Sequence, residues 1–281
     1  MVPVRNGEIW VGDSGLPGQG GDAGRPVLVM LHPGVGDSAV WEPVLPALAA
    51  RHRVVRYDSR GFGRSPAPNA PYSLVEDLAA VLDHLGLERV VLVGSSMGGA
   101  TALSLALDAP HRVAGLALLV PGVTGSPEVS PPGFYEEVAK LAEAGDTEAI
   151  VRLGLHHWGR GGGGTPETDP VAAALLRGVL PAWFASAPLN TPDAPAYDRL
   201  GEITAPTVLA LGELDQPEVA RCNEEMAERI PHCRLVRLAG SDHFPTLREP
   251  ESVVRIVQEL VQDLVEEIPV ESGEGVVEPS A

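Results

Sequence analysis

Short runs of apolar residues recur along the chain, and each run is bounded by glycine, proline or polar residues. The first run, residues 27–31 (Val-Leu-Val-Met-Leu), is followed directly by His32-Pro33-Gly34. Continuous apolar runs of this length are typical of strands that are covered on both faces of a sheet. Similar runs lie at residues 53–57, 90–93, 113–120, 207–211 and 234–238. The pattern predicts a buried central sheet.

The segments between these runs carry apolar residues at helical spacing. In residues 73–85 the leucines and valines fall on one face, and Ser73 with Glu76 forms a capping box at the start. A second helix with a clear apolar stripe is expected over residues 251–266. Strands that alternate with helices predict an α/β fold, with a mostly parallel, doubly wound β-sheet flanked by helices.

Residues 123–205 interrupt this alternation. They show helical patches at 134–144, 148–158 and 170–184, separated by proline- and glycine-rich segments. We expect a helical cap or lid inserted into a core formed by residues 1–122 and 206–268. Residues 269–281 are acidic and lack a periodic apolar face, so this tail is predicted to be disordered.

Charge and composition narrow the class of protein. The 281 residues include 20 Lys plus Arg and 38 Asp plus Glu, a net charge of −18 that opposes binding to nucleic acid or to an anionic membrane surface. The sequence shows neither an uninterrupted apolar run of membrane-spanning length nor a signal-peptide pattern at the N-terminus, so a cytoplasmic protein is expected. Cys222 and Cys233 lack metal-site spacing, and there is no nucleotide-binding glycine motif. We therefore expect no metal and no cofactor.

One motif carries chemistry. Gly94-Ser95-Ser96-Met97-Gly98 matches G-x-S-x-G, follows the apolar run at 90–93 and opens an alanine- and leucine-rich segment, 99–109. A tight strand-to-helix turn of this kind exposes the central serine at the edge of a sheet. Ser96 is therefore the candidate nucleophile.

Five segments of the chain, in this order, resemble the α/β-hydrolase family. They are residues 31–36, 57–65, 94–98, 212–215 and 240–245. The resemblance implies that Ser96 is the nucleophile, Asp215 the acid and His243 the base, with Glu213 as the alternative acid. A serine hydroxyl needs an imidazole that accepts its proton, and a carboxylate then orients the ring. The order Ser, Asp, His agrees with that family.

An oxyanion hole needs two fixed hydrogen-bond donors. The backbone N–H of Met97, just after the nucleophile, is one candidate. The other is expected in the loop after His32, with Gly34 first and Val35 second. Pro33 stands where the family more often has glycine, and proline has no N–H to donate.

Aromatic residues are the candidates for substrate binding. Trp158, Trp183 and Phe184 lie in the predicted insertion, and Phe244 follows the candidate base. They are expected to form an apolar pocket wall, although packing of the insertion onto the core explains them equally well.

The sequence thus predicts a cofactor-independent serine hydrolase for a small-to-medium, mainly apolar carboxylic ester, thioester or lactone, acting through an acyl-enzyme. The resemblance also admits a C–C bond or enol-lactone hydrolase, an acyltransferase, or a hydrolase-fold receptor without activity. The expected partner is a small-molecule substrate, and a homodimer is compatible with the sequence.

Overall fold

The computed structural model describes residues 1–16, 25–127 and 133–266. Within these residues, seven strands form one sheet in the order β3-β5-β4-β6-β7-β8-β9. Only β3 at one edge runs antiparallel to its neighbour, so the predicted, mostly parallel sheet is confirmed. The strands are β3 (Val11–Asp13), β4 (Val27–Leu31), β5 (Val54–Tyr57), β6 (Val90–Ser95), β7 (Val113–Leu119), β8 (Thr207–Gly212) and β9 (Arg234–Leu238).

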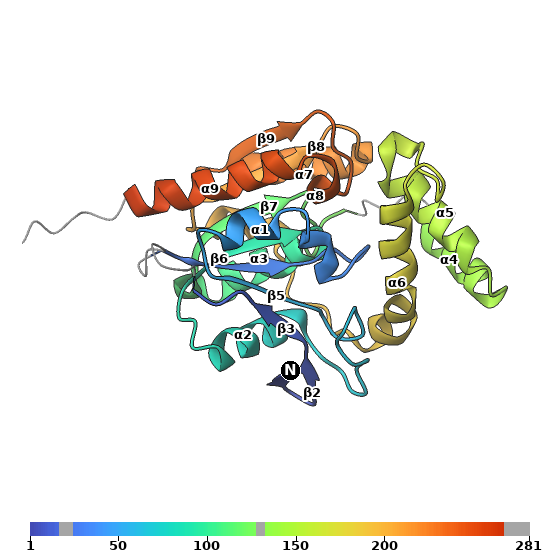
Figure 1. Ribbon diagram of the computed structural model, residues 1–281, viewed down its shortest axis with the longest axis horizontal. Helices are drawn as coiled ribbons and strands as arrows, with labels where there is room; N and C mark the ends of the chain where they lie inside the picture. Colours follow the sequence, from blue (N-terminus) through green and yellow to red (C-terminus); the bar gives the residue numbers. More distant parts are fainter. Residues whose placement is uncertain (17–24, 128–132, 267–281) are drawn as a thin grey trace, which may run out of the picture.

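Helices cover both faces of this sheet, which explains why the central strands are apolar throughout. One face packs against α2 (Leu74–His84), α3 (Met97–Asp108) and α7 (Pro217–Arg229). The other packs against α1 (Leu45–Ala49) and α9 (Pro250–Glu266), and Figure 1 shows these two helices on the opposite side from α2. The predicted cap of α2 is present, because the Ser73 hydroxyl accepts a hydrogen bond from the Glu76 N–H at 3.1 Å.

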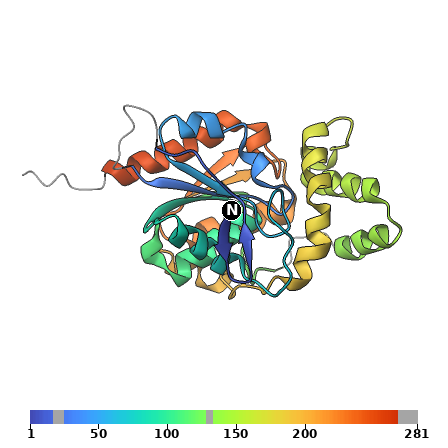
Figure 2. The same ribbon diagram turned by 60° about the horizontal axis from the view of Figure 1, so that its bottom comes forward.

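The insertion between β7 and β8 is helical. It contains α4 (Phe134–Glu143), α5 (Thr147–Trp158) and α6 (Pro170–Ser186), which lie together beyond one end of the sheet (Figures 1 and 2). These helices share a small apolar core of their own. Short 3-10 turns connect the remaining elements: Ser38–Trp41, Pro110–Arg112, Arg160–Gly162, Ala187–Leu189 and Tyr197–Glu202. Movement of the insertion as a lid stays a prediction, and the predicted disordered tail, 269–281, lies outside the described residues.

The sequence argument about membrane spans needs a correction. The segment Pro170–Leu189 is long and apolar enough to span a membrane by length and composition alone. In the structure, Leu176 and Leu180 of this segment pack into the core of the insertion. Its Arg177 pairs with Glu148 of α5 at 2.6 Å.

A buried ion pair fixes the N-terminal hairpin to the core. The hairpin consists of β1 (Val2–Val4) and β2 (Gly7–Ile9), which pair antiparallel. Arg60 contacts Asp77 of α2 through two hydrogen bonds of 2.7 and 2.6 Å, and both side chains are almost fully buried. The same guanidinium donates to the Arg5 carbonyl at 2.6 Å. This pair therefore joins three segments that are distant in sequence.

We expect Asp77→Asn to lower the free energy of unfolding by about 3 kcal/mol, because it leaves the Arg60 charge buried without its counter-charge. Urea denaturation measures this loss. The control is Asp83→Asn, which breaks the ion pair of Arg112 with a largely exposed carboxylate and should cost less than about 1 kcal/mol. Equal losses for the two variants would contradict this interpretation.

Candidate active site

Ser96 occupies the turn between β6 and α3, as the motif predicts. Its backbone has φ 48° and ψ −112°, a conformation that residues other than glycine rarely adopt. The turn needs glycine on both sides. A Cβ atom on Gly94 would lie 2.6 Å from the Gly98 carbonyl oxygen, and one on Gly98 would collide with the Leu31 carbonyl. The two glycines therefore let β6, α3 and β4 approach closely enough to form the turn.

The structure brings His243 and Asp215 to Ser96. The His243 Nε2 atom lies 2.9 Å from the Ser96 Oγ atom, and its Nδ1 atom lies 2.6 Å from Asp215 Oδ2. The three residues follow β6, β8 and β9, whose carboxyl ends meet at one edge of the parallel sheet. It is the carboxylate of Asp215, and not that of Glu213, that reaches the imidazole. Residues that are 147 and 28 positions apart in sequence thus form one chain of hydrogen bonds.

Two opposing effects set the protonation of His243. Burial lowers the pKa of the imidazole, but the negative charges of Asp215 and Asp242 and the hydrogen bond that the ring donates to Asp215 outweigh it, so the pKa is raised above the ordinary value. In the neutral ring, Nδ1–H donates to Asp215 and Nε2 is free to accept the Ser96 hydroxyl proton. The arrangement suits an imidazole that takes a proton from Ser96.

The candidate oxyanion donors lie beside Ser96. Met97 begins α3, so its N–H has no carbonyl of an earlier helical turn to bond. Gly34 and Val35 line the same cavity as Ser96 and Met97. The Gly34 carbonyl accepts a hydrogen bond of 2.7 Å from the Trp183 indole, so the insertion holds this loop in place.

His32 fixes the start of that loop. Its Nδ1–H donates to the Pro33 carbonyl at 2.8 Å, and its Nε2 accepts from the Ser59 N–H at 3.0 Å. Burial lowers the pKa of this imidazole, in agreement with a neutral ring that both donates and accepts. The role of His32 is therefore to hold the loop, which the motif alone did not reveal.

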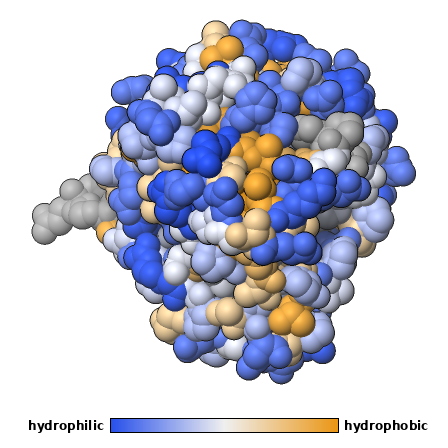
Figure 3. Space-filling view, turned by 90° about the vertical axis from the view of Figure 1, so that its right-hand side faces the viewer, coloured by the Kyte–Doolittle hydropathy of each residue, from blue (hydrophilic) through white to orange (hydrophobic). Residues whose placement is uncertain are grey.

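Ser96 opens onto a cavity of about 520 Å³ between the sheet edge and the insertion. The predicted residues Trp158, Trp183 and Phe184 line it, so the structure places three of the four aromatic candidates there. Tyr135 of α4 and Phe184 of α6 are both cavity-lining and exposed, which places the mouth between these helices. Figure 3 shows this side of the molecule as mostly hydrophilic, with a band of apolar residues through its middle.

Phe244 is a correction to the sequence prediction. It does not line the cavity but is 1% exposed and packs into the core of the insertion. The Arg248 guanidinium lies 5.6 Å from its ring centroid. A large apolar side chain is stabilised more by complete burial than by a place on a cavity wall, which accounts for this orientation.

Both the fold and this site define a hydrolase of the α/β type, and comparisons with known proteins agree. The family model described as alpha/beta hydrolase fold matches residues 26–150. A protein of Azorhizobium caulinodans named "Putative carbamate hydrolase RutD" is 40% identical over 83% of this chain and 89% of its own. The pimeloyl-[acyl-carrier protein] methyl ester esterase of Aeromonas hydrophila is 30% identical over 84% of this chain and 95% of its own.

A solved structure points the same way. The enol-lactonase from Burkholderia xenovorans LB400 superposes with a TM-score of 0.74 at 26% identity, covering 92% of this chain and 98% of its own. The chain belongs to the α/β-hydrolase family and is a hydrolase.

We expect an NMR titration to give His243 a pKa above the ordinary value of 6.5. Asp215→Asn should move that pKa downward, because the charge that stabilises the imidazolium is removed while burial continues to oppose it. The wild-type titration serves as the reference for the variant. An unchanged pKa in the variant would show that Asp215 does not control the ring.

Proposed function

We propose that the protein is a cofactor-independent serine hydrolase that cleaves a neutral, mainly apolar carboxylic ester, thioester or lactone through an acyl-enzyme. The observation that carries the proposal is the distance of 2.9 Å between Ser96 Oγ and His243 Nε2, with Asp215 behind the ring and the cavity in front of the hydroxyl. A nucleophile, a base and an orienting carboxylate within hydrogen-bond reach are the requirements of this chemistry.

In the first half of the reaction, Ser96 Oγ attacks the carbonyl carbon while His243 Nε2 accepts its proton. Negative charge develops on the carbonyl oxygen, which the N–H groups of Met97 and of Gly34 or Val35 stabilise. His243 then protonates the leaving alcohol or thiol. In the second half the same ring activates a water molecule, which releases the acid and restores the Ser96 hydroxyl.

The cavity favours an uncharged substrate. No Lys, Arg, Asp or Glu is among the described residues that line it. Its polar members include Tyr72, Ser186 and Asn190, and burial raises the pKa of Tyr72 to about 12, so this phenol stays neutral. A carboxylate carried into such a site loses its hydration without gaining a counter-charge. The volume is that of a site for a small-to-medium ligand.

Hydrolysis of enol-lactones, C–C bonds and carbamates, and acyl transfer, are alternatives to the proposed reaction that the same three residues serve. Est816, described as an N-acyl homoserine lactone degrading enzyme, is 29% identical with a TM-score of 0.73, covering 92% of this chain and 98% of its own. A panel of esters, thioesters, lactones, carbamates and vinylogous diketones distinguishes the hydrolytic alternatives. Added alcohol or amine that diverts product away from free acid indicates acyl transfer.

We expect a fluorophosphonate probe to label Ser96, and Ser96→Ala to abolish labelling and to lower p-nitrophenyl ester hydrolysis by about 1000-fold or more. Removal of the attacking oxygen is the physical reason. Ser104→Ala is the matched control, because Ser104 lies buried on α3 away from the cavity and its loss should leave labelling unchanged. Wild-type protein that never labels would favour the receptor alternative.

A pair of substrates tests the neutral cavity. We expect p-nitrophenyl hexanoate to have a kcat/KM at least about 100-fold above that of the mono-p-nitrophenyl ester of adipic acid, because only the second carries a carboxylate into the site. The two acyl chains have the same length, so cavity size is matched. Comparable values of kcat/KM would contradict an uncharged substrate class.

A further inference from the structure

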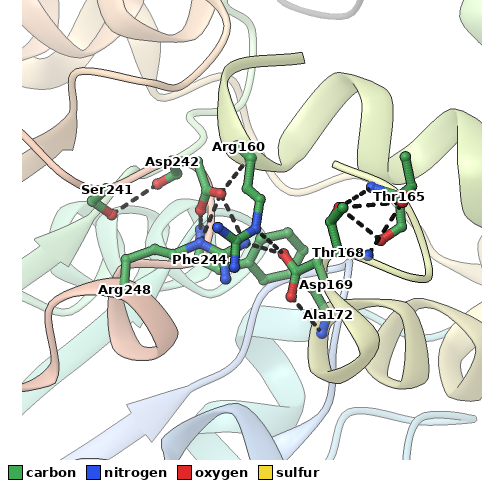
Figure 4. Close-up of polar contacts among 9 residues, drawn as sticks. All are labelled: Arg160, Thr165, Thr168, Asp169, Ala172, Ser241, Asp242, Phe244 and Arg248. Atoms are coloured by element: carbon green, nitrogen blue, oxygen red, sulfur yellow. Dashed lines mark hydrogen bonds and ion pairs between the residues drawn. The ribbon is translucent and has the colours of Figure 1, made fainter. Parts of the chain in front are cut away.

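The carboxylate of Asp242, directly before His243, is buried where the core meets the insertion. Its Oδ1 atom accepts the Phe244 N–H at 2.8 Å, and its Oδ2 atom accepts the Arg160 N–H at 2.6 Å. The same Oδ2 accepts Arg248 Nε–H at 2.8 Å, and Figure 4 shows these groups converging on the carboxylate. The Asp242 side chain is 1% exposed. Bonds from both the core and the insertion therefore fix its position.

Arg248 extends this network into the insertion. Its Nη2 atom pairs with Asp169, the N-cap residue of α6, whose side chain is also buried. Asp169 in turn accepts the Ala172 N–H at 3.3 Å, and Arg160 Nε lies 3.8 Å from its carboxylate (Figure 4). Two buried carboxylates thus share one largely buried guanidinium, with the half-exposed Arg160 as a second cation.

Stability alone does not account for such a network. Desolvation of buried charges offsets much of their attraction, and apolar side chains would join the insertion to the core equally well. Charge-assisted hydrogen bonds differ from apolar contacts in being directional. They set the distance and the angle at which the two parts meet.

The residue held at this junction is the candidate base. The backbone N–H of His243 donates to the Trp158 carbonyl at 3.2 Å. The centroids of the Trp158 and His243 rings lie 6.2 Å apart. Trp158 lines the cavity. We infer that Asp242 and Arg248 are positioning residues, which hold His243 and the α5–α6 corner of the insertion, residues 158–169, in one geometry. This inference rests on the role proposed above for His243.

The test uses Asp242→Asn and Asp169→Asn in the full chain, with the p-nitrophenyl ester that the wild type cleaves best. We expect Asp242→Asn to lower kcat by about 10- to 100-fold while KM changes by less than about threefold, since displacement of a base by a fraction of an ångström affects the transition state more than binding. The acid limb of its pH profile should move to lower pH, because a negative charge beside the imidazolium is lost.

Asp169→Asn separates positioning from the local charge. Asparagine still caps α6, so the helix start is preserved while the Arg248 ion pair is lost. We expect kcat to decrease by about three- to tenfold, because Asp169 acts on His243 only through Arg248. The acid limb of the pH profile should stay where it is in the wild type. If Asp242→Asn does not fold, the Asp169→Asn result decides the question.

Asp77→Asn is the matched control, because it also removes a buried carboxylate that pairs with an arginine. Here the arginine is Arg60, and neither Asp77 nor Arg60 lines the cavity. This control should lower stability and keep kcat within about twofold. If both network variants behave like this control, the inference is wrong. Fluorophosphonate labelling of wild-type Ser96 distinguishes failure of this inference from failure of the proposed function. If Ser96 is labelled but kcat is unchanged in Asp242→Asn and Asp169→Asn, only the positioning role is wrong. If Ser96 is not labelled, the proposed function is wrong.

Discussion

The rest of the site depends on the backbone conformation of Ser96. A positive φ at a residue with a side chain costs about 1–3 kcal/mol and persists only where surrounding contacts impose it. Here the Ser96 N–H donates to Leu119 of β7, and its carbonyl accepts from Ala100 and Gly122. The turn sits at the end of a central strand with neighbours on both sides. The sheet therefore imposes the strained backbone conformation. Because of this conformation, the Ser96 hydroxyl faces the cavity and lies beside the start of α3.

The insertion contributes more than a cavity wall. Its Trp183 holds the Gly34 carbonyl, on the side of the candidate oxyanion donors, and its Trp158 carbonyl holds the His243 N–H, on the side of the base. Two tryptophans of one segment thus contact both the loop of the candidate donors and the candidate base. Loss of these two hydrogen bonds would release both the loop of the candidate donors and the candidate base. The insertion is therefore linked to both parts of the proposed chemistry.

Local signals predicted the fold well, because buried parallel strands leave uninterrupted apolar runs and α2 carries its own cap. The motif around Ser96 also follows from the sequence, whereas Asp215 and His243 followed from the resemblance to the α/β-hydrolase family, and their place after strands of a parallel sheet agrees with it. The orientation of Phe244 did not follow from the sequence, because adjacency in sequence says nothing about which side of a loop a ring faces. The Asp242–Arg248–Asp169 network joins segments 79 residues apart, and no local pattern marks such a pairing.

The net charge of the molecule and the residues that line the cavity both disfavour the binding of anions. The chain carries a net charge of −18, which repels anions before they reach the mouth of the cavity. The described residues that line the cavity include no arginine or lysine to receive an anion that does arrive. The largely buried guanidinium of Arg248, which pairs with the residue before His243, is already engaged by two carboxylates. For the proposed function, discrimination against anionic substrates therefore needs no dedicated residue, because the described lining residues offer no lysine or arginine to an anion.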